Sequence, residues 1–188
     1  MYTFLYANRE IRIETESSLF SPKEADKGTL AMLKFVEFHA DDKVLDLGCG
    51  CGIVSLAAAA SGVQPSNLVL TDIDPTAVRV ASKNLNNNGY EGAICVVGDG
   101  LSQVPGSDFD LILSNPPYHT DFKVAKTFIE KGFNRLKIGG KMFMVTKRKD
   151  WYKNKLISIF GGVRIYEENG YYVFEAQKRA TSYATKRK

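Results

Sequence analysis

The chain has 188 residues, of which 44% are hydrophobic and 24% are charged, so its length favours one domain with a complete hydrophobic core. This composition excludes a disordered chain, a collagen and a coiled coil. The 25 Lys and Arg residues outnumber the 21 Asp and Glu residues, which gives a mild formal net charge of +4.

Residues 1–40 predict a hairpin followed by a helix. Apolar residues at 4–6 and an alternation of apolar and charged residues at 11–13 flank Asn8, a pattern typical of two strands joined by a turn. The Ser-Pro pair at 21–22 is a typical helix start, and we expect this helix to reach about Phe38.

From residue 44 onwards, short apolar strands alternate with helical segments. Strands are expected at 44–47, 68–70, 94–97, 109–113 and 142–145. Helices are expected at 53–60, from Asp74 to Gly89, from about 125 to the glycines at 139–140, and at 151–160. Two last strands, 163–166 and 171–176, flank an Asn-Gly turn, which is a strong hairpin signal.

This alternation predicts a parallel sheet with helices on both faces. Together with the antiparallel C-terminal hairpin, it gives an α/β fold with a mostly parallel, seven-stranded Rossmann-like sheet. Ligands of such open sheets bind beyond the carboxyl ends of the strands. Four consecutive strands bring polar or glycine-rich residues to that edge: Asp46 and the glycines after it, Asp72, Asp99 and residues 115–118.

The cysteines and histidines give no sign of a disulfide framework or a zinc site. The three cysteines have no paired spacing, and there are only two histidines and no C-x-x-C pair. The N-terminus lacks the basic segment and apolar stretch of a signal peptide. No run approaches the roughly 18–20 apolar residues that span a bilayer. We therefore expect a cytoplasmic protein without a metal and without a membrane partner.

The loop after the first parallel strand has the pattern D-x-G-x-G-x-G, from Asp46 to Gly52. Glycines at this position let the backbone approach a ligand, and the next helix offers free N–H groups. The dinucleotide fingerprint G-x-G-x-x-G is not matched, because residue 53 is Ile. An acid repels a pyrophosphate and suits a cationic ligand without phosphate. The alternative is a tight strand–helix turn that the aspartate caps.

Two further acids end the next strands. Asp72 can accept hydrogen bonds from a ribose diol, whereas Asp74 is better explained as a helix N-cap. Asp99 can accept from an exocyclic amine such as that of adenine, or it can be a turn residue before Gly100. Taken together with Asp46, these acids outline a nucleoside site without a phosphate cradle.

The segment Asn115-Pro116-Pro117-Tyr118 is the most specific feature of the sequence. Two prolines directly after a strand fix the backbone. The Asn115 amide oxygen and the Pro116 carbonyl can then accept both hydrogens of a planar amino group and orient its lone pair toward an electrophile. Tyr118 offers a flat face for stacking a base. The alternative is a rigid loop with an exposed tyrosine.

These motifs resemble those of the class I S-adenosylmethionine-dependent methyltransferases over nearly the whole chain. VLDLGCGCG is similar to motif I, TDID to the ribose-binding acid, GDG to the adenine-contacting acid, and NPPY to the amino-methylating motif IV. The lead-in LFSPKEADKGTLAML resembles the "methyltransferase small" family, which includes bacterial 16S rRNA guanine-N2 methyltransferases.

The resemblance implies a cofactor and a set of site residues. The cofactor is S-adenosylmethionine, with S-adenosylhomocysteine as the product, and the transfer is direct, without a metal or a covalent intermediate. The cofactor-binding residues implied are Asp46, Gly48, Cys49, Gly50, Asp72, Ile73, Asp99, Gly100 and Asn115. The catalytic residues implied are Asn115, Pro116, Pro117 and Tyr118, with Tyr118 also against the substrate base.

We expect a single methyltransferase domain over residues 1–188. It comprises an N-terminal hairpin and helix (1–40), a catalytic core (41–177) and a basic tail (178–188). The best-known guanine-N2 members carry a second methyltransferase-like domain before this one, so the choice of target stays open.

Two basic clusters indicate where RNA would bind. Lys147, Arg148 and Lys149 follow the fifth parallel strand at the ligand edge, near Trp151, and we expect them to contact RNA phosphates. The tail 178–188 holds five Lys or Arg residues and no acid, so the rest of the chain has a formal charge of −1. The alternative is a solvated helix start and a frayed tail.

Several functions use this chemistry, and the sequence leaves the target nucleotide, the state of the RNA and the oligomeric state open. NPPY also serves adenine-N6 methylation of RNA or DNA and glutamine methylation in release factors. Different classes are a non-catalytic RNA-binding module and an NAD oxidoreductase, although the latter lacks its fingerprint. The lead-in favours methylation of guanine N2 in ribosomal RNA, with rRNA or a ribosomal subunit as the partner.

Overall fold

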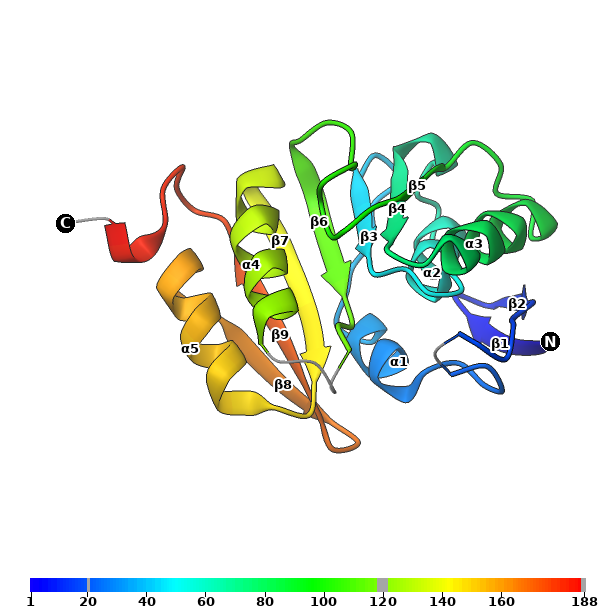
Figure 1. Cartoon of the computed structure of the whole chain (residues 1–188), viewed down its shortest axis with the longest axis horizontal. Helices are drawn as coiled ribbons and strands as arrows, with labels where there is room; N and C mark the ends of the chain where they lie inside the picture. Colours follow the sequence, from blue (N-terminus) through cyan, green and yellow to red (C-terminus); the bar gives the residue numbers. More distant parts are fainter. Residues whose placement is uncertain (20, 118–121, 187–188) are drawn as a thin grey trace.

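A seven-stranded sheet runs through the molecule in the order β5-β4-β3-β6-β7-β9-β8 (Figure 1). The computed structural model describes residues 1–19, 21–117 and 122–186. The five strands from β5 to β7 are parallel, and β9 pairs antiparallel with both β7 and β8. The strands are β3 (Val44–Leu47), β4 (Leu68–Asp72), β5 (Ile94–Val97), β6 (Phe109–Ser114), β7 (Leu136–Thr146), β8 (Arg164–Glu168) and β9 (Tyr171–Gln177). The predicted mostly parallel sheet with its antiparallel hairpin is confirmed.

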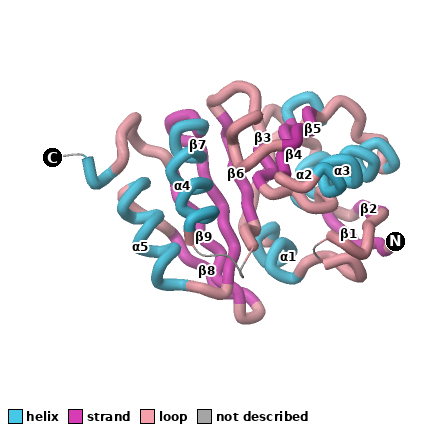
Figure 2. Tube along the Cα trace, viewed as in Figure 1, coloured by secondary structure: helices cyan, strands magenta, loops and turns pink. Residues whose placement is uncertain are grey.

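Helices cover both faces of the sheet, as predicted (Figure 2). One apolar core gathers beneath α1 (Lys27–Leu33), α2 (Ile53–Ala60) and α3 (Pro75–Asn87). A second core gathers beneath α4 (Lys123–Arg135) and α5 (Lys149–Phe160), two helices that also pack on each other. Two short 3-10 helices, η1 (Pro65–Asn67) and η2 (Ala184–Lys186), complete the described helices. None of the helices described here is long and apolar enough to cross a membrane.

The side chains of the central strand β3 alternate between the two cores. Successive side chains of a strand point to opposite faces. Val44 belongs to the core beneath α2, and Leu45 and Leu47 belong to the core beneath α4. Asp46 therefore faces α2, and this placement brings a buried carboxylate to the start of that helix.

The N-terminal hairpin consists of β1 (Tyr2–Tyr6) and β2 (Arg9–Ile13), joined by Ala7 and Asn8 in the left-handed region. The predicted strand–turn–strand is confirmed. The buried Asn84 of α3 attaches this hairpin to the sheet. Its amide oxygen accepts from the Glu14 N–H at 2.8 Å, and its amide nitrogen donates to the carbonyls of Glu14 and Cys51. The hairpin, α3 and the glycine loop after β3 are thus held by one side chain.

The predicted helix from 21–22 to about Phe38 is wrong at both ends. Ser21 has φ +52 and its hydroxyl donates to the Glu24 carbonyl, so this segment forms a turn. The helix begins only at Lys27, because Asp26 is its N-cap and accepts from the Thr29 N–H at 2.8 Å. It ends at Leu33.

The prediction that the helix over 125–133 continues to Gly139-Gly140 is also wrong. The helix ends at Arg135, and both glycines lie in β7. A Cβ on Gly140 would lie 2.6 Å from the Phe109 carbonyl oxygen, so glycine permits a close approach of β7 to β6. Gly139, with φ +89, and Gly140 pair instead with Lys178 through backbone hydrogen bonds.

Candidate active site

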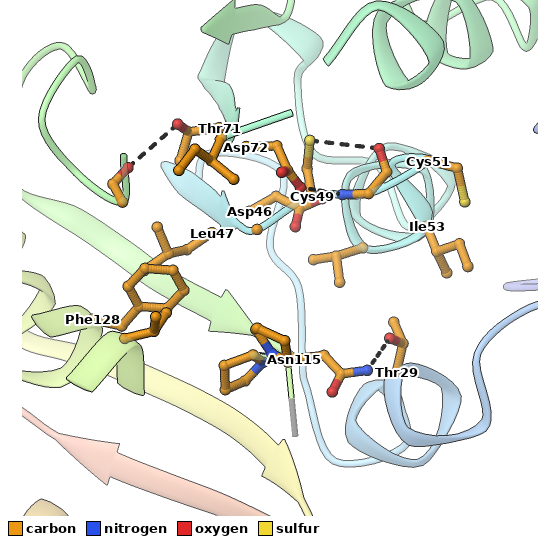
Figure 3. Close-up of a pocket in the computed structure, with 18 of the residues that line it drawn as sticks. Thr29, Asp46, Leu47, Cys49, Cys51, Ile53, Thr71, Asp72, Asn115 and Phe128 are labelled. Atoms are coloured by element: carbon orange, nitrogen blue, oxygen red, sulfur yellow. Dashed lines mark hydrogen bonds between the residues drawn. The ribbon is translucent and has the colours of Figure 1, made fainter. Parts of the chain in front are cut away.

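A cavity of about 450 Å³ opens at the carboxyl ends of β3, β4, β5 and β6, a size typical of small-molecule sites. It gathers Asp46, Gly48, Cys49 and Gly50 after β3, Asp72 and Ile73 after β4, Asp99 and Gly100 after β5, and Asn115, Pro116 and Pro117 after β6 (Figure 3). Every predicted cofactor residue therefore lines one cavity. Of the predicted catalytic residues, Tyr118 lies outside the described part of the chain.

The loop after β3 depends on glycines in the left-handed region. Gly48, Gly50 and Gly52 have φ of +79, +53 and +87. The N–H groups of Gly48 and Cys49 both donate to the Thr71 carbonyl of β4. A Cβ on Gly52 would lie 3.0 Å from the Cβ of Ala81, so α3 packs directly against the loop. This backbone forms the floor of the cavity beside β4.

Asp46 is 2% exposed and its carboxylate binds the first turn of α2. Its Oδ2 accepts from the Ser55 N–H at 3.2 Å and from the Ser55 hydroxyl at 2.8 Å. Burial raises the pKa of Asp46 to about 7, against the two Ser55 hydrogen bonds, which lower it. The aspartate thus does cap the turn, the alternative left open above. It also takes an N–H that a phosphate would need at this helix start.

Asp72 supports the same loop from β4. Its Oδ2 accepts from the Gly50 N–H at 2.9 Å, and its Oδ1 accepts from the Asp74 N–H at 3.0 Å. Asp74 in turn accepts from the Thr76 N–H and is the N-cap of α3, as predicted. Asp99 and Ile73 also line the cavity, where Asp99 is exposed and Ile73 is 68% exposed. The cavity is therefore acidic, with an apolar side chain at its rim.

The amide group of Asn115 is held by two residues of the segment that begins α1. Its Nδ2 donates to Thr29 Oγ1 at 3.0 Å (Figure 3). It also donates to Asp26 Oδ1 at 2.6 Å. Asp26 Oδ1 also accepts from the Thr29 hydroxyl at 3.1 Å and is 9% exposed. Because both amide hydrogens are directed at α1, the amide oxygen points away from it. Sequence reasoning missed Asp26 and Thr29, although D-x-x-T is a helix-capping pattern.

Phe128 of α4 forms the wall that the sequence did not predict. Its ring lies against the glycines of two loops: a Cβ on Gly48 would be 3.9 Å from it, and a Cβ on Gly100 only 3.2 Å. Both glycines have positive φ. They therefore serve the backbone turn and make room for the aromatic ring. Val124, one turn before Phe128, lines the cavity as well.

Lys147, Arg148 and Lys149 do not line the cavity. They follow the carboxyl end of β7, and their predicted contact with RNA stays a prediction. Each lies over an aromatic ring: Lys147 over Tyr171 at 4.9 Å, Arg148 over Phe122 at 5.1 Å, and Lys149 over Tyr172 at 5.0 Å. The part of the chain that the structure describes contains no group of three or more His, Cys, Asp or Glu side chains placed to hold a metal ion.

Comparisons with known proteins agree with this geometry. A family model described as "Methyltransferase small domain" matches residues 10–175. Ribosomal RNA small subunit methyltransferase C of Cronobacter sakazakii is 34% identical over 88% of this chain and 48% of its own length. The uncharacterized protein YbxB of Bacillus subtilis is 29% identical over 94% of this chain and 90% of its own length.

Among solved structures, the 16S rRNA N2 methyltransferase RsmC of T. thermophilus, in complex with AdoMet and guanosine, is similar with a TM-score of 0.87. It is 26% identical, and the match covers 95% of this chain and 50% of that one. The chain thus spans about half the length of the rRNA methyltransferases it matches.

Proposed function

The chain belongs to the methyltransferase small domain family, and we propose that it transfers a methyl group from S-adenosylmethionine to an exocyclic amino group, guanine N2 of ribosomal RNA. The observation that carries this proposal is the Asn115 amide, fixed by Asp26 and Thr29 at the wall of an acidic, nucleoside-sized cavity. An amide held in this way presents an acceptor, as a planar amine requires.

The polar groups that line the cavity fit S-adenosylmethionine better than a dinucleotide. Asp72 and Asp99 give the cavity acidic groups, to which Asp46 adds as it ionises around its pKa of about 7, raised by burial. Ionised carboxylates favour a cationic ligand and repel a pyrophosphate. The Ser55 N–H, which a phosphate at the start of α2 would use, is taken by Asp46. S-adenosylmethionine, when bound, supplies a methyl group on a positively charged sulfur.

The residues of the cavity divide the work of binding. The backbone around Gly48 to Gly50 and the nearby Asp46 hold the methionine end, Asp72 holds the ribose, and Asp99 with Ile73 and Gly100 holds the adenine. Cys49 contributes its backbone, because its side chain is buried and its pKa is raised by that burial. Asn115 and Phe128 close the side toward the substrate.

Asn115 and Pro116 act on the substrate amine by orientation. The Asn115 oxygen and the Pro116 carbonyl accept the two amino hydrogens and direct the nitrogen lone pair into the cavity. Pro116 is buried and Pro117 fixes the backbone after it. Such positioning accounts for a large part of the lowering of the activation barrier for methyl transfer, and it needs no general base. Tyr118 stacks on the base that carries the amine.

Guanine N2 is favoured among the possible amines by one solved relative, and rRNA as the substrate by several curated ones. The T. thermophilus neighbour is named for N2 methylation of 16S rRNA and is complexed with guanosine. The curated relatives of about twice the length are named ribosomal RNA small subunit methyltransferases. Ribosomal RNA, free or in a subunit, is therefore the proposed partner, and the bacterial cytoplasm the proposed compartment.

The test is methyl transfer by Asn115→Ala with total rRNA as acceptor. We expect transfer to fall at least a hundredfold, while calorimetric affinity for S-adenosylmethionine changes by less than about threefold. Asn67→Ala, in η1 at the opposite end of β4, is the matched control and retains activity. Turnover in Asn115→Ala at the wild-type rate contradicts the assigned role.

The acceptor is identified by mass mapping of rRNA nucleosides from a strain that lacks the gene. We expect N2-methylguanosine to be lost at one position. Loss of N6-methyladenosine would instead support adenine N6. Unchanged rRNA nucleosides, with loss of methylglutamine from a release factor in peptide mass spectrometry, would support glutamine methylation.

A further inference from the structure

A cluster of cations and aromatic rings lies on the ligand edge of the sheet, outside the cavity. We call it the rim cluster: Lys147, Arg148, Lys149, Phe122, Trp151, Tyr171 and Tyr172. The cations follow β7, the tyrosines begin β9, and Phe122 is the N-cap of α4. The ends of β6 and β7, the start of α5 and the β8–β9 turn lie at the same end of the sheet (Figure 1).

The cations of the rim cluster have no carboxylate partner within the described part of the chain, unlike two lysines near them. Lys141 on the same strand pairs with Glu175 at 2.8 Å, and Lys155 on the same helix pairs with Glu130. Lys147, Arg148 and Lys149 are all exposed and lie over aromatic rings at 4.9 to 5.1 Å. Three positive charges are therefore available to an anionic partner.

The rings of the cluster are only partly covered and lie close to the cavity. Phe122 stacks on Trp151 with ring centroids 4.3 Å apart and planes at 11°. All four rings are half-buried. Phe122 stands two residues before Val124, which lines the cavity, and Tyr172 pairs with Thr146 at the end of β7. When one nucleotide of an RNA strand enters the cavity, the neighbouring nucleotides therefore lie close to these rings.

We infer that the rim cluster binds the unpaired RNA nucleotides next to the methylated base, with phosphates on the cations and a base on the rings. Cations bind the phosphate backbone, and aromatic faces stack on any unpaired base. A duplex presents its phosphates but keeps its bases stacked inside, so it uses only half of this surface. The substrate class is accordingly a single-stranded loop or an open segment of rRNA.

The test is fluorescence anisotropy with a labelled 12-nucleotide single-stranded RNA and with a duplex of the same sequence. The probe is titrated with the full chain saturated with S-adenosylhomocysteine. Arg148→Gln with Lys149→Gln is compared with Lys131→Gln plus Arg179→Gln, which removes one lysine and one arginine from exposed sites elsewhere. Trp151→Leu tests the rings, with thermal unfolding as the check that the variant folds.

We expect the rim pair to weaken RNA binding at least tenfold and the control pair by less than twofold. The slope of log affinity against log salt should decrease by about 1.4 for the rim pair, since each single-strand phosphate contact contributes about 0.7. Trp151→Leu should weaken the single strand at least fivefold and leave the duplex unchanged. A folded Trp151→Leu with unchanged single-strand binding, or equal losses in both charge pairs, overturns the inference.

This inference rests on the proposed function, but the assay separates the two. If the wild type binds the RNA through the rim cluster and yet transfers no methyl group, the proposed reaction is wrong and the RNA surface stands. If rim variants keep wild-type transfer rates at saturating RNA and wild-type affinity for the RNA, the reaction stands and the RNA surface is wrong.

Discussion

Asn115 is positioned by residues that come 86 and 89 places earlier in the chain. Its amide nitrogen donates to Thr29 and Asp26, and these two also bond each other. Asparagine rotates freely about its last torsion unless its amide is held. The cluster therefore fixes the orientation of the amide, and under the proposed function Asp26 and Thr29 act as positioning residues.

Thr29→Val tests this positioning without removing the helix cap, because the Thr29 N–H still donates to Asp26. We expect kcat for methyl transfer to fall about 10- to 100-fold, since a misplaced orienting group loses rate of this order. Thr29→Ser, which restores the hydroxyl, should regain most of kcat. Steady-state kinetics separate the effect, because KM for S-adenosylmethionine should change far less. If Ser and Val behave alike at this position, the hydroxyl does not position Asn115.

Asp46 gives the stability of the protein an unusual pH dependence. Its pKa is raised to about 7 by burial, from an unfolded value of 3.8. Between these values the folded state binds more protons than the unfolded one, so the Asp46 contribution to stability falls as pH rises from about 4 to about 7. Above pH 7 the loss is complete and constant.

Urea unfolding of wild type and Asp46→Asn from pH 4 to pH 8 measures this contribution. Asparagine cannot ionise, and its amide oxygen still accepts from Ser55. We expect the free energy of unfolding of wild type, relative to the variant, to fall by about 1–4 kcal/mol over this range. A difference that is constant with pH would show that Asp46 titrates at its ordinary value in the folded protein.

At the residue scale, the sequence predicted the strand-end acids and Asn115 because the carboxyl ends of parallel strands meet at one edge. It did not predict Phe128 or Thr29. Each of these reaches the cavity only through packing between segments distant in sequence. The ring of Phe128 could be read only as a core position on its helix, and Thr29 only as a helix residue.

At the scale of elements, the glycine loop and α3 are fitted to each other at Gly52. The residue has φ +87 and its missing Cβ would lie 3.0 Å from the Cβ and 3.3 Å from the Cα of Ala81. Glycine is thus needed twice, for the backbone conformation and for the close approach of the helix. The two requirements can be separated by comparison with Gly89.

Gly52→Ala should destabilise the fold more than Gly89→Ala. Gly89 has φ +79 and no atom within 4 Å of its missing Cβ, so alanine there meets only the backbone penalty of about 1 kcal/mol. At Gly52 the contact with Ala81 adds to that penalty, and we expect a loss of about 2–4 kcal/mol in urea unfolding. Equal losses at the two positions would mean that α3 shifts freely away from the loop.

The boundaries of the helices show which features the sequence pattern predicts and which it does not. The helix α2 begins and ends as predicted, and α3 begins as predicted, because an alanine-rich run and an Asp-Pro start mark them locally. The end of α3 is at Asn87, two residues before the predicted stop at Gly89. The helix α1 begins five or six residues later than the Ser-Pro pair predicts, since the stronger cap is Asp26. Gly139 and Gly140 resemble a helix stop, but they serve the close contact of β7 with β6, which no local pattern indicates.

For the whole molecule, charge is divided between a cavity lined by four aspartates, Asp26, Asp46, Asp72 and Asp99, and a rim with three exposed cations. The basic end of the chain is separate from both. Lys178 is buried and donates to the Leu136 carbonyl, whereas η2 lies beyond α4 and α5, away from the ligand edge (Figure 1). The Tyr183 ring packs on Phe133 at 5.2 Å, so the chain remains anchored up to that residue.

Truncation after Tyr183 removes Lys186, Arg187 and Lys188 and leaves this anchor in place. We expect RNA affinity to fall by a smaller factor than for Arg148→Gln with Lys149→Gln, because Lys186 lies in η2, away from the ligand edge. The truncation should leave the affinity for S-adenosylmethionine unchanged in calorimetry. Raising the salt concentration from 50 to 200 mM should lower the affinity for RNA about tenfold and change the affinity for S-adenosylmethionine far less. A larger loss on truncation than in the rim pair would place the main RNA contact on the tail.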